Sequence, residues 1–419
     1  MTLARSTKPG AKIKRIVLDL ANKRRISFAH CGKVTMATST LLPTPQASPK
    51  MESGRSKQTS LSLFRSAARP GCTEIADVPG NAPPEYPLRS SGSDAQLVGI
   101  ARLAASSPLT EAKRGTEYFQ LPVRSILNHC DSDRVPFNWT INPYRGCEFG
   151  CKYCYARYTH EFMELDGDDF ERKIYAKKSA GELFERDIDK PALEDEHIAI
   201  GTATDPYQPA ERDFRNTRAI LERAATREGL SLSITTKSDQ VIRDIDLLKK
   251  ISEKSSVSVN LSITTIRTRL ARLLEPRAPR PDLRLKAVKT LHEAGIDVGV
   301  LVMPVIPHIT DDKTDLERLA RAARDAGAQW FASNVLFLMP ASQKTFLPFI
   351  AKAFPRLARG YQEWYGKNGS GPTESYKREL SDVFKALRQK YGFRGRPINP
   401  SAPRKSAPQL TLALEPAAQ

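Results

Sequence analysis

Three cysteines lie close together in the sequence, at Cys147, Cys151 and Cys154. They are separated by gaps of three and two residues, which is too close in the chain for ordinary disulfide partners. The chain has six cysteines in 419 residues, which does not resemble the dense disulfide framework of a small secreted protein. Thiolate ligands select zinc, copper(I) or iron–sulfur clusters. The cysteines therefore predict a metal centre.

This centre is one protein ligand short of a closed site. No cysteine follows Cys154, and the nearest one upstream is Cys130. A coordination position that the protein leaves open is typical of catalytic rather than structural metal sites. Two interpretations remain open. One is a structural zinc site that His160 completes, and the other is a four-iron cluster whose fourth iron binds a small molecule.

The cysteines follow the first of six apolar segments that we predict to be strands. These segments are Phe137–Tyr144, His197–Ala203, Ser231–Thr236, Val257–Thr264, Ile296–Met303 and Trp330–Leu338. Helical periodicity separates most of them, at Asp213–Thr226, Val241–Lys250, Asp282–Glu293 and Asp315–Ala326. Several strands are continuous runs of Val, Ile and Leu, which is typical of a parallel sheet buried on both faces. In such sheets, functional groups lie in the loops after the carboxyl ends of the strands.

Alternating strands and helices predict an α/β fold of βα units with right-handed crossovers. Six units fit a partial (βα)6 TIM-like barrel better than a full eight-stranded one, and a doubly wound open sheet is the alternative. We expect this core over residues 114–340 and a C-terminal helical region over residues 341–395, with helices at 346–365 and 375–391. The composition predicts disordered ends at residues 1–113 and 396–419.

The chain is basic, with a formal net charge of +18. Residues 1–110 hold 16 Lys or Arg against 6 Asp or Glu and so supply +10 of that charge, which favours a solvated extension over a nucleic-acid surface. The segment Glu275–Arg280 (EPRAPR) is a rigid basic loop that either holds a phosphate backbone or is simply exposed. No segment approaches the roughly 18 uninterrupted apolar residues of a membrane helix, so we expect a cytoplasmic protein with no membrane partner.

The spacing C-x3-C-x2-C, with Tyr153 just before the last cysteine, resembles the signature of radical S-adenosylmethionine enzymes. Over about residues 118–340, the sequence is similar to the spore photoproduct lyase-like branch of that superfamily. The motifs that carry this resemblance are NPYRGC, CKYCYAR, GTATDPYQPAE, TTKSD and EPRAPRPDLRLKAV…AGIDVGVLVMPVIP.

The resemblance implies a [4Fe–4S] cluster on Cys147, Cys151 and Cys154, with S-adenosylmethionine on the fourth iron. An electron from the cluster would cleave the cofactor to a 5′-deoxyadenosyl radical, which removes a hydrogen atom from an unidentified substrate. A reducing partner such as flavodoxin or ferredoxin is therefore expected.

The resemblance also implies four cofactor contacts. Tyr153 is expected near the adenine, and Thr204 and Ser262 are expected to contact the cofactor through their hydroxyl groups. Lys237 is expected to pair with the carboxylate of the cofactor, a role that suits a fixed ammonium group.

Other polar residues near these motifs have less specific expected roles. Tyr155 takes the place of a tyrosine that relays a hydrogen atom in the lyase, and it is the candidate catalytic residue, with a role as a wall of the pocket as the alternative. Tyr144 and Arg145 are expected to shield the metal centre. Asp205 and Glu211 are candidates for ribose or amino-group contacts, although Asp205 is equally suited to capping a turn.

One position departs from the lyase pattern. That family has a cysteine immediately before the cofactor-contacting hydroxyl, whereas this chain has Ala203. The missing thiol disfavours repair of a DNA photoproduct but leaves radical generation intact. Three functions remain open: a radical S-adenosylmethionine enzyme with an unidentified substrate, an enzyme that repairs or modifies DNA or RNA, and a non-enzymatic protein that binds zinc or nucleic acid.

Overall fold

The computed structural model describes residues 97–113, 115–130, 135, 137–193, 195–366, 369 and 371–394. The predicted disorder of residues 1–96 and 396–419 lies outside these described residues. Within them, regular structure begins earlier than expected, with α1 (Gly99–Ala105) and β1 (Leu109–Lys113). The predicted boundary at residue 113 is therefore wrong. A short helix that buries only Ala101 and Ala104 has too small an apolar face to stand out in the sequence.

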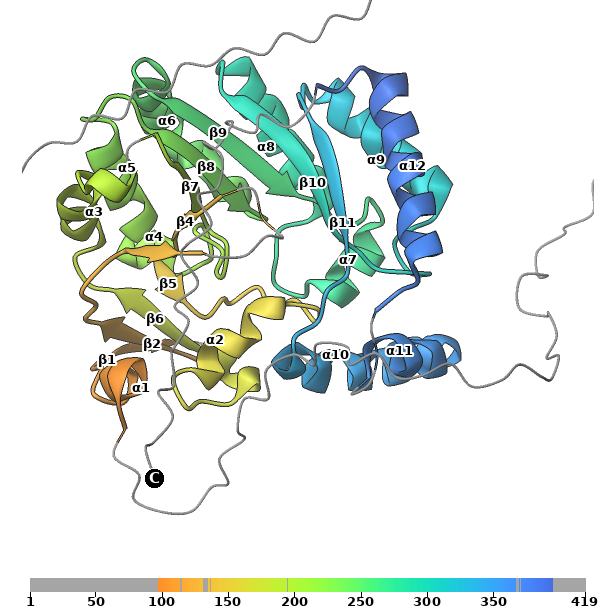
Figure 1. Cartoon of the computed structure of the whole chain (residues 1–419), viewed down its shortest axis with the longest axis horizontal. Helices are drawn as coiled ribbons and strands as arrows, with labels where there is room; N and C mark the ends of the chain where they lie inside the picture. Colours follow the sequence, from red (N-terminus) through yellow and green to blue (C-terminus); the bar gives the residue numbers. More distant parts are fainter. Residues whose placement is uncertain are drawn as a thin grey trace, which may run out of the picture. The chain divides into compact units, whose positions relative to one another are not determined.

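The larger sheet has seven strands, of which six are parallel and follow one another in chain order (Figure 1). Its order is β11 (Phe331–Val335), β10 (Asp297–Val305), β9 (Ser256–Ser262), β8 (Ser231–Thr236), β7 (His197–Ile200), β4 (Trp139–Ile141) and the antiparallel edge strand β3 (Leu127–His129). A doubly wound sheet requires a reversal of strand order, and these six strands have none. The partial-barrel prediction is confirmed.

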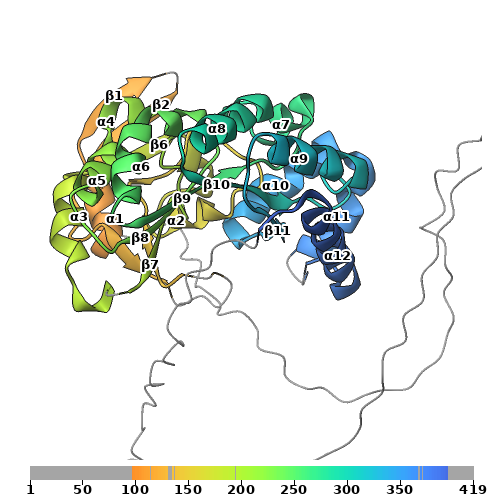
Figure 2. The ribbon, with the colours of Figure 1, turned by 90° about the horizontal axis from the view of Figure 1, so that it is seen from above.

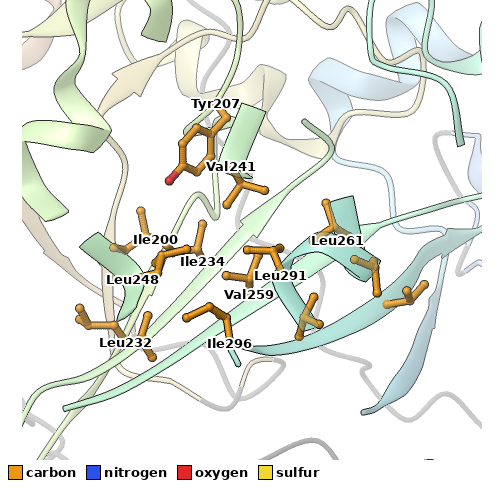
Figure 3. Close-up of a cluster of buried hydrophobic side chains, with 14 of the residues drawn as sticks. Ile200, Tyr207, Leu232, Ile234, Val241, Leu248, Val259, Leu261, Leu291 and Ile296 are labelled. Atoms are coloured by element: carbon orange, nitrogen blue, oxygen red, sulfur yellow. The ribbon is translucent and has the colours of Figure 1, made fainter. Parts of the chain in front are cut away.

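The helices between these strands lie along one side of the sheet (Figure 2). They include α4 (Glu211–Phe214), α5 (Asn216–Ala224), α6 (Ile245–Ser252), α7 (Thr268–Leu274), α8 (Pro281–Glu293) and α9 (Lys313–Asp325). The core forms between the two layers. In Figure 3, Ile200, Ile234 and Val259 from three neighbouring strands lie beside Leu248 and Leu291 from the helices, and all five side chains are fully buried.

A second sheet of four strands was not predicted. Its order is β1, β2 (Thr116–Leu121), β6 (Lys173–Lys177) and β5 (Tyr144–Arg145), and the helices α2 (Tyr158–Glu161) and α3 (Ala180–Ile188) flank β6 in the chain. The predicted strand Phe137–Tyr144 is in fact two short strands, β4 and β5, in different sheets. Pro143 lies between them and has no backbone N–H to continue a ladder.

Three helices complete the described chain: α10 (Pro340–Ala353), α11 (Ala358–Tyr365) and α12 (Glu374–Tyr391). The single helix expected over 346–365 is broken where Pro355 follows Phe354. The helix α12 packs on the larger sheet, where the Phe384 and Phe331 rings stack with centroids 5.3 Å apart. Of the helices described, none has the length and apolar character to cross a bilayer.

Candidate functional site

Residues 146–154, which we call the cysteine loop, leave β5 through a turn that only glycine can make. Gly146 has φ +83°, and a Cβ there would lie 2.7 Å from the carbonyl oxygen of Lys173. The next backbone N–H, of Cys147, donates to the Phe170 carbonyl at 2.9 Å. Farther along, the N–H of Lys152 donates to the Leu274 carbonyl at 2.9 Å. Backbone hydrogen bonds therefore hold the loop to two other segments, one at Phe170 and one at Leu274.

The segment after β7 holds the start of the same loop. The Gly146 carbonyl accepts hydrogen bonds from Thr204 Oγ1 at 2.6 Å and from Gln208 Nε2 at 3.1 Å. Gln208 Oε1 in turn accepts from the backbone N–H of Glu148 at 3.0 Å. Thr204 therefore uses its hydroxyl to position the cysteine loop, and its contact with the cofactor stays a prediction. Gln208 was missed by the sequence analysis.

The three thiols are reduced and enclosed. Cys147 and Cys151 are each 8% exposed, and Cys154 is partly buried. Burial is the largest effect on all three, and it raises the pKa of Cys147 well above its ordinary value and the pKa of Cys151 to about 12. The proximity of the other thiols raises the pKa of Cys147 further. The protein alone therefore holds them as neutral thiols, and a cationic ligand is needed to stabilise three thiolates.

The donor set fits an iron–sulfur cluster better than a zinc ion. Within the described chain, no three His, Cys, Asp or Glu side chains converge on a position for one metal ion. His160 is also engaged elsewhere: it is fully buried, its Nε2 lies 2.9 Å from the Lys173 carbonyl and its ring packs on Phe170. Thiolates of a cluster bind different iron atoms and need not converge on one point.

The C-terminal helices α10 and α11 share a buried apolar cluster with the cysteine loop. A continuous buried cluster joins the thiols of Cys147 and Cys151 to side chains of the loop, the barrel and these two helices. Its members include Phe149 and Tyr153 from the loop, Leu274 and Ile306 from the barrel, and Phe346, Ile350, Tyr361 and Tyr365 from α10 and α11. This apolar cover excludes bulk water from the thiols.

A buried ionic network adjoins the loop at Tyr153. Its hydroxyl donates to Glu275, whose Oε1 also accepts from Thr264 Oγ1 at 2.9 Å. Glu275 Oε2 pairs with Arg284 Nη2 at 2.5 Å, and Arg284 Nη1 donates to the carbonyl of Ser262 at 2.9 Å. Glu275 and Arg284 are only 2% and 1% exposed. This network therefore links Tyr153 to the backbone carbonyl of Ser262, and the predicted contacts of both residues with the cofactor stay predictions.

The expectation of an exposed basic loop at Glu275–Arg280 is wrong at its first residue. Glu275 points inward and is neutralised by Arg284, while Arg277 and Arg280 are paired with Glu171 and Asp282. A signal for this network exists in the sequence. Arg284 stands at helical spacing with Ala287, Val288 and Leu291, all of which are buried. A charged residue on a buried helix face predicts an enclosed ionic partner.

Lys237 lies beside this network, directly after β8. Its ammonium is 5.8 Å from the centroid of the Tyr153 ring. Burial alone would lower the pKa of its ammonium, but nearby groups that include the Cys151 sulfur and the Glu275 carboxylate outweigh that effect and raise the pKa. Among the described residues, no carboxylate lies within ion-pairing distance of the ammonium. Lys237 is therefore a cation that faces the cysteine loop without a direct partner there.

Tyr155 and Ala203 come together on the other side of the loop. The Tyr155 side chain is 40% exposed, and its hydroxyl donates to the carbonyl of Thr202. The backbone N–H of Ala203 donates to Asn142 Oδ1 at 2.7 Å. The hydroxyl of the aromatic residue after the last cysteine therefore reaches the backbone of Thr202, which directly precedes the position where the lyase-like pattern has its thiol.

Three predicted polar contacts have structural roles instead. Asp205 caps the turn after β7, because it accepts from Thr236 Oγ1 at 2.6 Å and from the N–H of Lys237 at 2.7 Å. Glu211 is fully buried and accepts from the Tyr144 hydroxyl and from Arg243. Tyr144 therefore points away from the cysteine loop, into a separate apolar cluster. Both carboxylates are saturated by groups of the protein.

Glu275→Gln is expected to lower the free energy of unfolding by about 3–5 kcal/mol, because it leaves the buried Arg284 guanidinium without its counter-charge. Urea denaturation followed by circular dichroism measures this. The matched control is Asp282→Asn, which removes the exposed pair with Arg280 and should cost less than about 1 kcal/mol. Equal effects of the two substitutions would contradict the role assigned to the network.

A family model described as the radical SAM superfamily matches residues 141–321. An uncharacterized protein of Mycobacterium tuberculosis (strain ATCC 25618 / H37Rv) is 31% identical over 325 residues, which cover 76% of this chain and 95% of the relative. An uncharacterized protein of Methanocaldococcus jannaschii is 35% identical over 177 residues, which cover 41% of this chain and 62% of the relative.

Among solved structures, the fold resembles that of spore photoproduct lyase. Its complex with dinucleoside spore photoproduct has a TM-score of 0.51 at 17% identity, over 72% of this chain and 85% of the lyase. A mutant of that lyase with bound AdoMet and dinucleoside spore photoproduct has a TM-score of 0.50, also at 17% identity, over 73% and 85% of the two chains. At this identity, the likeness concerns the fold alone.

Proposed function

Since the chain belongs to the radical SAM superfamily, we propose that it is an enzyme that removes a hydrogen atom from an unidentified substrate with a [4Fe–4S] cluster and S-adenosylmethionine. When bound, these two groups supply a reductive cleavage that yields a 5′-deoxyadenosyl radical. The observation that carries the proposal is the cysteine loop, with three reduced thiols in an apolar enclosure and, within the part of the chain that the structure describes, no group of side chains that would close a metal site around them.

The protein's own residues would hold and shield these groups. Cys147, Cys151 and Cys154 would bind three irons, and the Lys237 ammonium would pair with the carboxylate of S-adenosylmethionine. Tyr153 is fixed in place by Glu275 and Thr264, so its ring would be a rigid wall for the adenine. The apolar cover from α10 and α11 would keep water away from a reactive radical. A one-electron donor of the flavodoxin or ferredoxin class would be the reducing partner.

Cys147→Ala is expected to abolish the cluster, because two cysteines cannot replace three ligands. After anaerobic reconstitution with iron and sulfide, the variant should retain little iron. With dithionite and S-adenosylmethionine, it should form at least 100-fold less 5′-deoxyadenosine than the unaltered protein, about 2.7 kcal/mol in activation free energy. The matched control is Cys130→Ala, which should retain iron. Stoichiometric zinc without iron, or wild-type product from the variant, would contradict the proposal.

Lys237→Met is expected to weaken binding of S-adenosylmethionine at least tenfold, about 1.4 kcal/mol, because it removes the cation proposed for the carboxylate. Calorimetry on the reconstituted protein measures the dissociation constant, and iron content shows that the cluster is intact. Lys249→Met, at an exposed position on α6, should leave the constant within twofold. If both variants bind the cofactor equally well, Lys237 has another role.

Repair of a DNA photoproduct is the second candidate function, and the fold shared with spore photoproduct lyase favours it. Ala203 opposes it, since no thiol is available there to return a hydrogen atom. We expect the reconstituted protein not to convert dinucleoside spore photoproduct into the intact dinucleotide, as measured by chromatography of the products. Ala203→Cys restores the family thiol and is the comparison variant. Complete repair by the unaltered protein would make this function the leading one.

A further inference from the structure

Lys177 is a buried basic residue that forms no ion pair with any residue that the structure describes. It ends β6 and is only 5% exposed. Within the described chain, its ammonium makes no hydrogen bond and no ion pair. Burial is the main cause that lowers its pKa from 10.5 to about 7, and the nearby Arg145 lowers it further. A charge in this position is costly unless an anion accompanies it.

Arg145 faces Lys177 from the neighbouring strand. Arg145 on β5 is paired with Tyr175 on β6, and Lys177 lies two residues beyond Tyr175 on the same face of the sheet. Long side chains at such diagonal positions reach one another. The Arg145 Nε atom is fully enclosed without a hydrogen-bond partner, and its Nη1 donates to the Thr159 carbonyl at 3.3 Å. Two basic side chains, Arg145 and Lys177, therefore lie on one face of the smaller sheet, and each has N–H donors without an acceptor among the described residues.

The acidic residues of the adjoining segment are already engaged with other groups. Asp169 pairs with Lys173 at 2.9 Å, Glu171 with Arg157 at 2.6 Å and Glu161 with Lys344 at 3.3 Å, and Asp168 accepts from Thr345 at 2.8 Å. Each of these four carboxylates would have to give up its present partner in order to neutralise Lys177. No described carboxylate therefore serves as a counter-ion for Lys177, and with a pKa near 7 the amine either loses its proton or gains a charge partner from outside the described residues.

His160 borders this face but is not a donor for an anion. A carbonyl oxygen only accepts hydrogen bonds, so Nε2 of His160 carries the proton that the Lys173 carbonyl accepts. Burial lowers the pKa of His160 to about 4, so at neutral pH its enclosed Nδ1 presents a lone pair. Two side chains, Lys177 and Arg145, therefore define the site.

We propose that Lys177 and Arg145 form a binding site for a small oxyanion of the phosphate class, next to the cysteine loop. A phosphate group carries about −1.5 to −2 charges at pH 7, enough to balance both cations. The guanidinium offers paired N–H donors to its oxygens, and the ammonium adds a point charge. Lys177 is only 5% exposed, so a ligand that reached it would be a small ion or a terminal phosphate rather than a polymer backbone. The site does not depend on the proposed function.

Calorimetric titration of the full-length protein with inorganic phosphate, in a chloride background of constant ionic strength, tests the site. Lys177→Met and Arg145→Gln should each weaken phosphate binding at least tenfold. The matched control is Lys178→Met, which alters the exposed neighbour of Lys177 and should leave binding within twofold. Equal binding by wild type and Lys177→Met, or an equal loss in Lys178→Met, would overturn the assignment.

Thermal unfolding gives a readout that does not depend on activity or on the cluster. Without phosphate, Lys177→Met should melt at a higher temperature than wild type, because it removes a buried charge that has no partner. Saturating phosphate should raise the melting temperature of wild type and leave that of the variant unchanged. A wild type whose melting temperature is insensitive to phosphate would overturn the proposal.

Titration with thymidine 5′-monophosphate distinguishes two sources of the phosphate group, a nucleotide-like ligand and the free ion. If it binds at least tenfold tighter than inorganic phosphate, and thymidine alone does not bind, the site takes the phosphate of a nucleotide-like ligand. Similar constants for both phosphates identify the free ion. Nucleotide binding that Lys177→Met leaves unchanged would count against the site. Each of these titrations can fail while Cys147 still supports S-adenosylmethionine cleavage, so the two proposals fail separately.

Discussion

The carbonyl oxygen of Gly146 is the contact on which the site depends. It accepts from Thr204 and Gln208, which follow a strand of the larger sheet, while the next N–H is bound to the carbonyl of Phe170 beside the smaller sheet. The cysteine loop is therefore held between two sheets that share no strand. The left-handed conformation of Gly146 makes both hydrogen bonds possible, and any side chain there would collide with backbone. The positions of the thiols follow from this junction.

The second constraint is electrostatic. Enclosing the thiols makes their ionisation costly, yet a metal centre needs thiolates. The surrounding structure opposes that cost with fixed positive charge, since Lys237 and Arg284 both act to lower the pKa of Cys151 against the effect of burial. Arg284 is itself tolerated only because Glu275 neutralises it. The pKa of the Cys151 thiol thus depends on burial, on the two cations Lys237 and Arg284, and on the ion pair between Arg284 and Glu275.

The sequence predicted best what depends on neighbours in the chain. Apolar runs such as Ile296–Met303 identified the parallel strands, and the three cysteines identified the loop, because both signals are local. The smaller sheet was missed because its two-residue strand β5 has no periodicity of its own. Glu275 was misassigned because the signal from its charge partner Arg284 was not used and its other partner, Tyr153, lies 122 residues away. Thr204 was recognised by resemblance, but its bond to Gly146 required the folded backbone. The predicted roles of Tyr155, Lys237 and Ser262 stay predictions.

The cover over the cysteine loop has a consequence for the order in which the protein matures. The side chains of Phe346, Ile350, Tyr361 and Tyr365 that enclose the loop belong to α10 and α11, which leave the ribosome nearly 200 residues after the cysteines. Until these helices have been synthesised and have docked, their side chains cannot enclose the thiols. In the folded protein, access to the thiols through this apolar cluster requires α10 and α11 to open locally. Whether the thiols are accessible therefore depends on whether the C-terminal helices are docked.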